Sequence, residues 1–172
     1  MNDNLDVKKW VRYAQMDYDA AKNMSELFNP VPLEIVCFHC QQAAEKILKA
    51  YALVMGEPLK KIHNLTIINA QCKKHNPDFS DFDRVVIMLN DYAVIHKYPT
   101  NEDAVTQQDM DVALENAHAI LEFTKARIDE VLALRCDSDY TKTTPTEAAI
   151  LKEAEEECEH SEIVHDEEID WD

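Results

Sequence analysis

The sequence predicts an all-α protein, an antiparallel up-and-down bundle of four long helices plus one short helix. The chain has a single glycine in 172 residues, whereas β-sandwiches, β-barrels and phosphate-binding glycine loops need repeated residues at positive φ. Apolar side chains recur at helical spacing, and the segments between the periodic stretches are short. We expect the bundle over residues 1–135, and a linker, a short helix and an acidic, partly disordered tail over residues 136–172.

The apolar periodicity sets the expected helices, at residues 6–28, 32–56, 64–74, 80–93 and 106–135. The segment NPVP ends the first helix because proline cannot continue the hydrogen-bond ladder, and Gly56 suits a left-handed cap after the second. Asn76 and Pro77 break the third helix. Ser80 followed by Asp83 resembles a capping arrangement for the fourth, and acidic residues in the first turn of the fifth suit the helix macrodipole.

The second helix carries the clearest two-sided pattern. Its apolar stripe consists of Val36, Cys40, Ala43, Ala44, Ile47, Tyr51, Val54 and Met55. The opposite face holds Gln42, Glu45, Lys46 and Lys49, with Phe38 projecting among them. Glu45 and Lys49 have the spacing of an ordinary i,i+4 surface pair, so a solvated face is the plain interpretation. An exposed aromatic ring at the start of such a stripe is, however, typical of interfaces and base-stacking sites.

The formal charge of −17 is concentrated near the C-terminus. Residues 1–135 hold 15 basic and 20 acidic residues, whereas residues 136–172 hold 2 and 14. Such a tail would repel phosphate backbones, so a dedicated DNA-binding protein is not expected. Pro145 is well placed to begin a short helix. The acidic end that follows is interpreted as a solubilising tail rather than a docking peptide.

Cysteine usage and hydropathy indicate a cytoplasmic protein with no membrane association. No run approaches the roughly 20 apolar residues that cross a bilayer, and the N-terminal segment MNDNLDVKKW is too polar for a secretory signal. Five cysteines are an odd number in a chain without a signal. Reduced thiols, rather than a disulfide framework, are therefore expected.

Candidate metal ligands and catalytic residues form no recognised pattern. The soft ligands Cys37, His39, Cys40, Cys72 and His75 lack the paired turns of zinc sites. Buried cysteine is the commoner explanation, so no metal site is expected. The motifs GxSxG, HExxH, GxGxxG and the P-loop are absent, and no catalytic residue is assigned. Seven histidines are available as general bases, but spacing places none of them beside a nucleophile.

Several short segments occur in an informative order, namely FHCQQAAEKILKAY, then a glycine, then HNL at 63–65, LNDY at 89–92 and KYP at 97–99. In order and spacing they resemble the HEPN domain, the higher-eukaryote and prokaryote nucleotide-binding domain. The similarity covers roughly residues 7–132, and the helix-two block is its most specific part. The resemblance implies a helical bundle that is commonly a homodimer. In bacteria it also implies a possible toxin–antitoxin pairing with a small nucleotidyltransferase.

Many members of this family are ribonucleases whose signature is an arginine, four to six residues, and then a histidine. The arginines of this chain, none of which is followed by a histidine at that spacing, are Arg12, Arg84, Arg127 and Arg135. Lys97 stands where short members usually have arginine, and it lacks the planar fork that grips phosphate. Ile62 replaces a common threonine. These departures weaken the expectation of RNA cleavage more than the expectation of the fold.

Three functions remain in competition, and a nucleotide is the one small-molecule ligand considered. The first is a non-catalytic module, regulatory or of the toxin–antitoxin type, that binds a nucleotide or a partner protein. Its predicted ligand-binding residues are Phe38, Gln42, Glu45, Lys49, His63, Asn90, Tyr92, Lys97 and Tyr98. The second is a divergent ribonuclease with His96 as base and Lys97 as cation. The third is a structural dimerisation module, in which Phe38 meets its symmetry mate.

Overall fold

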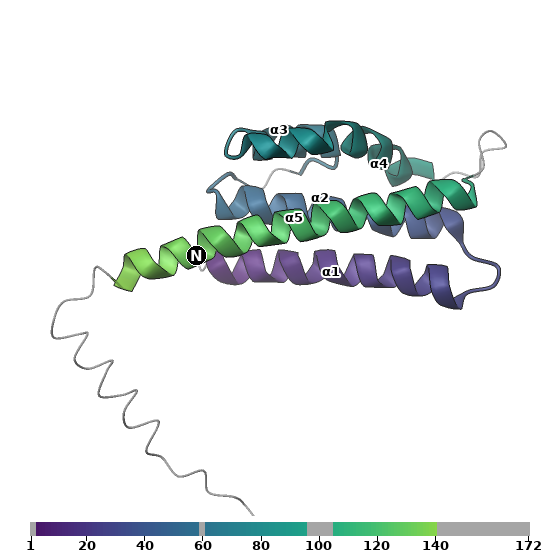
Figure 1. Cartoon of the computed structure of the whole chain (residues 1–172), viewed down its shortest axis with the longest axis horizontal. Coiled ribbons are helices and arrows are strands. Elements are labelled where there is room, and N and C mark those ends of the chain that lie inside the picture. The colour runs from purple at the N-terminus through teal and green to yellow at the C-terminus, as the bar shows by residue number, and fades with distance from the viewer. Residues whose placement is uncertain (1–2, 59–60, 96–104, 141–172) are drawn as a thin grey trace, which may run out of the picture. The chain divides into compact units, whose positions relative to one another are not determined.

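The described part of the chain, residues 3–58, 61–95 and 105–140 of a computed structural model, contains helices and no strands. The elements are α1 (Asp3–Leu27), α2 (Leu33–Val54), α3 (Leu65–Lys73), the 3₁₀-helix η1 (Pro77–Phe82), α4 (Asp83–Ile95) and α5 (Gln107–Tyr140). Figure 1 shows them running up and down, which confirms the predicted all-α bundle. Within these residues no helix combines the length and apolar character that a membrane span requires.

The chain divides into two compact units, Met1–Leu132 and Ala133–Asp172. The last helix, α5, ends at Tyr140 rather than at the expected Arg135. The linker predicted from Cys136 was therefore wrong over residues 136–140, because CDSDY contains neither proline nor glycine to end a helix. The helix expected from Pro145 and the acidic tail lie outside the described residues.

The second helix, α2, is central to the first unit. It packs along α1 and also contacts α3 and α4 (Figure 1). The predicted apolar stripe is buried, apart from Met55, which is partly exposed at the C-terminal end. Because α2 has neighbours on several sides, polar residues off the stripe are buried as well, among them Gln41, Glu45 and Lys49.

Three helix boundaries follow from local side-chain chemistry. Gly56 has a φ of +85°, as predicted for a left-handed cap after α2. The side chain of Asn64 caps α3 by accepting a hydrogen bond of 3.2 Å from the Ile67 amide. Thr106 and Asp109 form a reciprocal cap at α5, with Asp109 N donating to Thr106 Oγ1 at 3.2 Å and Thr106 N donating to Asp109 Oδ2 at 2.9 Å. The hydrogen bonds from Thr106 lower the pKa of Asp109.

The fourth helix begins differently from the expectation. The capping arrangement predicted for Ser80 and Asp83 is replaced by a 3₁₀ turn that starts at Pro77, where Asn76 Oδ1 accepts a hydrogen bond of 2.9 Å from the Asp78 amide. The α-helix starts only at Asp83. Its carboxylate accepts hydrogen bonds of 2.7 Å from Lys73 Nζ and so ties α4 to α3. The 3₁₀-helix that begins at Pro77 therefore makes the α-helix start about one helical turn later than predicted.

Aromatic rings fill the core between η1, α2 and α5. Phe79 is fully buried and packs against Tyr51 of α2, with 4.7 Å between ring centroids. It also meets Phe123 of α5 edge-on at 5.1 Å. Phe82 adds a further contact to Phe123, with 5.2 Å between ring centroids. The short η1 segment is thus anchored by the core and not only by its own backbone.

Candidate functional site

Two residues of the polar face of α2, Glu45 and Lys49, are buried, which corrects their interpretation as an ordinary surface pair. Glu45 is 4% exposed and Lys49 is 8% exposed. The i,i+4 spacing did predict their contact, since Lys49 Nζ lies 2.8 Å from Glu45 Oε1. Burial differs from the expectation because α1, α3 and α4 all pack against this helix. A buried pair of this kind needs additional hydrogen bonds to offset the cost of removing both charges from water.

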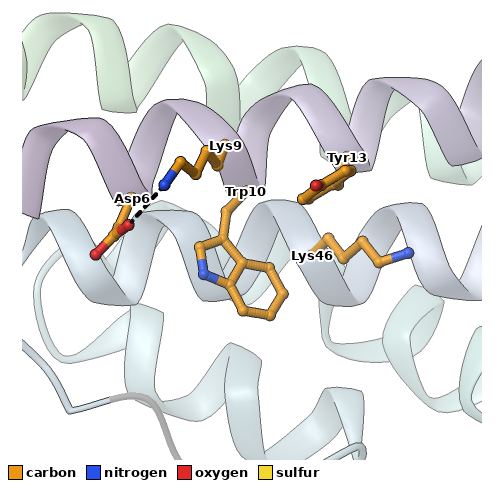
Figure 2. A pocket seen from close by; sticks show the side chains of 5 residues that line it. All are labelled: Asp6, Lys9, Trp10, Tyr13 and Lys46. Atoms are coloured by element: carbon orange, nitrogen blue, oxygen red, sulfur yellow. Dashed lines mark ion pairs between the residues drawn. The ribbon is translucent and has the colours of Figure 1, made fainter.

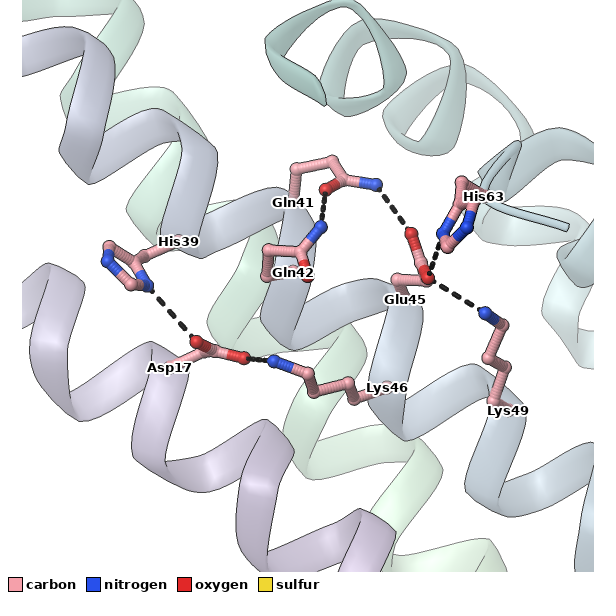
Figure 3. A network of polar contacts seen from close by, with 8 residues as sticks. All are labelled: Asp17, His39, Gln41, Gln42, Glu45, Lys46, Lys49 and His63. Carbon is pink, nitrogen blue, oxygen red and sulfur yellow. Dashed lines mark hydrogen bonds and ion pairs between the residues drawn. The ribbon is translucent and has the colours of Figure 1, made fainter. Parts of the chain in front are cut away.

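The Glu45 carboxylate has those hydrogen bonds (Figure 3). Gln41 Nε2 donates to Oε2 at 3.1 Å, and Oε1 contacts both Lys49 Nζ at 2.8 Å and His63 Nδ1 at 2.9 Å. Gln42 Nε2 in turn donates to Gln41 Oε1 at 2.7 Å. Gln41 is fully buried, whereas the His63 side chain is 75% exposed. We call these five residues the Glu45 cluster; it connects a buried carboxylate to an imidazole at the surface.

A second group of ions joins α1 to α2. Asp17 on α1 accepts a hydrogen bond from Lys46 Nζ through Oδ2, and its Oδ1 lies 3.1 Å from His39 Nδ1 (Figure 3). The Asp17 side chain is 14% exposed and that of Lys46 is 26% exposed. Partial burial lowers the effective dielectric around the pair. Asp17 therefore fixes the direction in which Lys46 leaves α2.

A pocket of about 310 Å³ opens between α1 and α2. Most of its lining surface is apolar, and the residues that line it are Asp6, Lys9, Trp10, Tyr13 and Lys46 (Figure 2). Trp10 and Tyr13 present their rings from successive turns of α1, and the stem of Lys46 lies near both. Lys9 Nζ is 3.5 Å from Asp6 Oδ1 at the exposed edge. A concave, aromatic pocket with a few charged groups is typical of small-ligand sites.

Trp10 connects the pocket to the Glu45 cluster. The Lys49 ammonium lies over the Trp10 ring, 5.8 Å from the centroid, in the geometry of a cation–π contact. Lys46 lines the pocket and belongs to the Asp17 group as well. Two residues that line the pocket are therefore held by polar neighbours: Trp10 contacts Lys49 of the Glu45 cluster, and Lys46 is paired with Asp17.

The other predicted ligand-binding residues have different surroundings. Phe38 is half-buried and meets His39 edge-on, with 5.5 Å between ring centroids. Asn90 Oδ1 accepts a hydrogen bond of 3.0 Å from the Leu65 amide and so anchors the start of α3. Tyr92 is buried, and this burial raises its pKa to about 12. Of the predicted set, the structure brings together Gln42, Glu45, Lys49 and His63, whose assignment to a ligand stays a prediction. Lys97 and Tyr98, like His96, lie outside the described residues.

Three cysteines of the described chain are buried free thiols, Cys37, Cys40 and Cys72. Burial raises the pKa of Cys37 and of Cys72 to about 12, and it raises the pKa of Cys40 further. Thiols of this kind are neutral at ordinary pH and act as small apolar side chains. Among the described residues, no group of three or more histidine, cysteine, aspartate or glutamate side chains is arranged to hold a metal ion.

Sequence reasoning missed three residues that organise this region, namely Trp10, Asp17 and Gln41. Trp10 fits the apolar spacing of the first helix, so periodicity predicts a core residue rather than a pocket residue. Gln41 gave a usable signal, because Gln41 and Glu45 have i,i+4 spacing and glutamine side chains pair at that distance. Asp17 gave no such signal in the sequence, since its partners His39 and Lys46 lie 22 and 29 residues further along the chain.

Comparison with known proteins agrees with the helical architecture. A family model described as the HEPN domain matches residues 7–128. The structure of TT1696 from Thermus thermophilus is similar at a TM-score of 0.60 and 23% identity, covering 70% of this chain and 96% of that one. ST0689, an archaeal HEPN homologue, is similar at a TM-score of 0.56 and 26% identity, covering 71% of this chain and 97% of that one. No functionally curated protein gives a significant match.

Proposed function

The chain belongs to the HEPN domain family, and from this premise we propose that it is a non-catalytic module that binds a nucleotide in the pocket between α1 and α2. The observation that carries the proposal is the pairing of Trp10 and Tyr13 rings with lysine side chains around one cavity. Aromatic rings stack on nucleobases largely without regard to sequence, because every base has a π-face.

The size and charge of the pocket support this ligand class. A volume of about 310 Å³ is at the small end of the range of ligand sites, so it suits one base better than an oligonucleotide. The Lys9–Asp6 pair is exposed and long at 3.5 Å, and such pairs contribute little energy. Lys9 can therefore move away from Asp6 at small cost when a ligand enters, whereas Lys46 stays with Asp17 and packs its stem beside the base.

A non-catalytic role rests on the sequence and on the engaged side chains. The arginine–spacer–histidine signature of the ribonucleases is absent, and the Lys49 ammonium is held between Glu45 and Trp10. Incubation with RNA of mixed sequence should therefore leave the RNA intact. Cleavage that is lost in His96→Ala would favour the ribonuclease alternative instead.

The proposal is tested by thermal shift with the four ribonucleoside monophosphates. A ligand that binds only the folded state raises Tm, and at a hundredfold excess over Kd it adds about 2.7 kcal/mol. Tyr13→Ala should weaken or remove the response. Met16→Ala is the matched control, because Met16 and Tyr13 are 51% and 52% exposed on the same helix and Met16 does not line the pocket. The absence of any shift in the wild type would overturn the nucleotide proposal.

We extend the proposal to the oligomeric state, the cellular location and the partner of the protein. The module serves as a cytoplasmic homodimer and as a regulatory or toxin–antitoxin-type subunit, with a nucleotidyltransferase-like protein as the candidate partner. Phe38, half-buried on α2, is the ring expected at the dimer seam. Sedimentation of Phe38→Asp tests this, since an unchanged dimer would remove Phe38 from the interface.

A further inference from the structure

We infer that His63, held by Glu45, contacts the phosphate of the nucleotide whose base occupies the pocket. The inference rests on the proposed nucleotide function and makes it more specific, because it names the side chain that contacts the phosphate.

Lys49 connects the pocket to His63 through direct contacts. Lys49 Nζ lies 5.8 Å from the centroid of the Trp10 ring that lines the pocket. The same ammonium is 2.8 Å from Glu45 Oε1, and His63 Nδ1 is 2.9 Å from that oxygen. Lys49 and His63 are therefore neighbours on one carboxylate oxygen, as Figure 3 shows. A continuous line of contacts, from the Trp10 ring through Lys49 and this oxygen, therefore leads from the pocket wall to the imidazole.

The imidazole of His63 is exposed, and its contact with Glu45 sets its direction. The His63 side chain is 75% exposed, although the Glu45 side chain that it contacts is only 5% exposed. The carboxylate at Nδ1 orients the ring, and in the imidazolium form both ring nitrogens are donors, so that Nδ1–H is used by Glu45 and Nε2–H is left to donate to a phosphate oxygen. His63 is thus a surface group that is oriented in advance, which lowers the entropic cost of a contact.

The charges of the groups around His63 decide which ligands it can contact. A bare carboxylate beside His63 would repel phosphate, but Lys49 contacts the same oxygen of Glu45 and neutralises it. Gln41 occupies the other oxygen and adds no charge. Lys61, two residues before His63, is exposed and adds positive charge to the same loop. The surroundings of the imidazole therefore favour an anion over a metal cation.

Calorimetric titration separates the phosphate contact from binding of the base. The probes are a nucleoside, its 5′-monophosphate and inorganic phosphate, each titrated into the wild type, His63→Ala and His75→Ala. His75 is the matched control, because its Nε2 also contacts a carboxylate, that of Glu57 at 3.1 Å, and it belongs to neither the pocket nor the cluster. His63→Ala removes an exposed side chain, and thermal unfolding checks that the variant folds.

We expect the monophosphate to bind the wild type about tenfold more tightly than the nucleoside, as one hydrogen bond to a charged group provides. His63→Ala should abolish that preference and leave nucleoside affinity unchanged, whereas His75→Ala should keep both. A preference that survives in His63→Ala would overturn the inference but not the proposed function. Failure of both nucleoside and nucleotide to bind the wild type would overturn the proposed function and this inference together. Tight binding of inorganic phosphate alone would overturn the inference as well, because it would show an anion site unrelated to the pocket.

Discussion

Gln41 and Glu45 lie one turn apart on α2 and are joined by a hydrogen bond of 3.1 Å between Gln41 Nε2 and Glu45 Oε2, with both side chains buried. The amide holds one carboxylate oxygen so that the other is left to Lys49 and His63. The cluster thus satisfies its polar atoms inside the helix packing, as buried polar groups must. Its stability depends on every member remaining paired.

Truncation of Glu45 should be strongly destabilising. In Glu45→Ala the Lys49 ammonium stays buried without its carboxylate, and breaking one side of a buried ion pair costs about 3–5 kcal/mol. Urea unfolding followed by circular dichroism measures the loss. Glu130→Ala is the control, because the Glu130–Arg127 pair is exposed at the surface and should change stability by less than about 1 kcal/mol. Equal losses in the two variants would contradict a buried, paired Glu45.

Alkaline conditions should destabilise the protein through its buried thiols. The folded-state pKa of Cys37 and of Cys72 is raised from 9.0 to about 12. Between these values the unfolded chain loses thiol protons that the folded chain keeps, so stability is complete below about pH 9 and falls as pH rises toward 12. Urea unfolding at a series of pH values tests this. A Cys37→Ala/Cys72→Ala variant should show a shallower decline over the same window, and an identical decline would contradict the assignment.

Gly56 should tolerate substitution only at a conformational cost. Its φ of +85° is unfavourable for residues with a Cβ, yet an added Cβ would meet no atom within 4 Å. Gly56→Ala should therefore lose about 1–2 kcal/mol from backbone strain alone. Gly56→Asn should lose less, because asparagine tolerates the left-handed region. Thermal unfolding of the pair checks the order, and a larger loss for asparagine would point to a steric cause instead.

Removal of the Phe79 ring should open a cavity in the aromatic core. Phe79 is fully buried among Tyr51, Phe82 and Phe123, and truncating such a ring to alanine costs about 3–5 kcal/mol. Ile87→Ala serves as the comparison, because Ile87 is 58% exposed on α4 and should change stability by less than about 0.5 kcal/mol. Chemical denaturation of both variants gives the two values. A small loss for Phe79→Ala would mean that the surrounding rings collapse into the space.

The fold was predictable because its signals are local. The apolar stripe of α2, the NPVP break and the positive φ of Gly56 depend on residues within a few turns of one another, and the structure has them as expected. The 3₁₀-helix that begins at Pro77 was not predicted, because the same few residues also fit a capping pair, Ser80 and Asp83, at the start of an α-helix. The extension of α5 to Tyr140 was missed because a polar composition was taken as a helix end.

The candidate site was less predictable because burial is not a local property. Glu45 and Lys49 have the same spacing as any surface pair, and only packing by neighbouring helices makes the pair buried. Asp17 and Trp10 contribute from α1, far from α2 in sequence, so periodicity gives no sign of the contact between Asp17 and Lys46 or between Trp10 and Lys49. His63 entered the prediction through family resemblance, and its carboxylate partner is visible only in three dimensions.

The aromatic rings around Phe79 anchor η1 to the long helices. Through Tyr51 and Phe123 they join η1 to both α2 and α5, so the segment that joins α3 to α4 is anchored in the aromatic core. The residues that line the pocket, among them Tyr13 and Lys46, come from α1 and α2 and not from η1. We therefore expect a ligand to enter and leave the pocket without any rearrangement of the segment around Pro77.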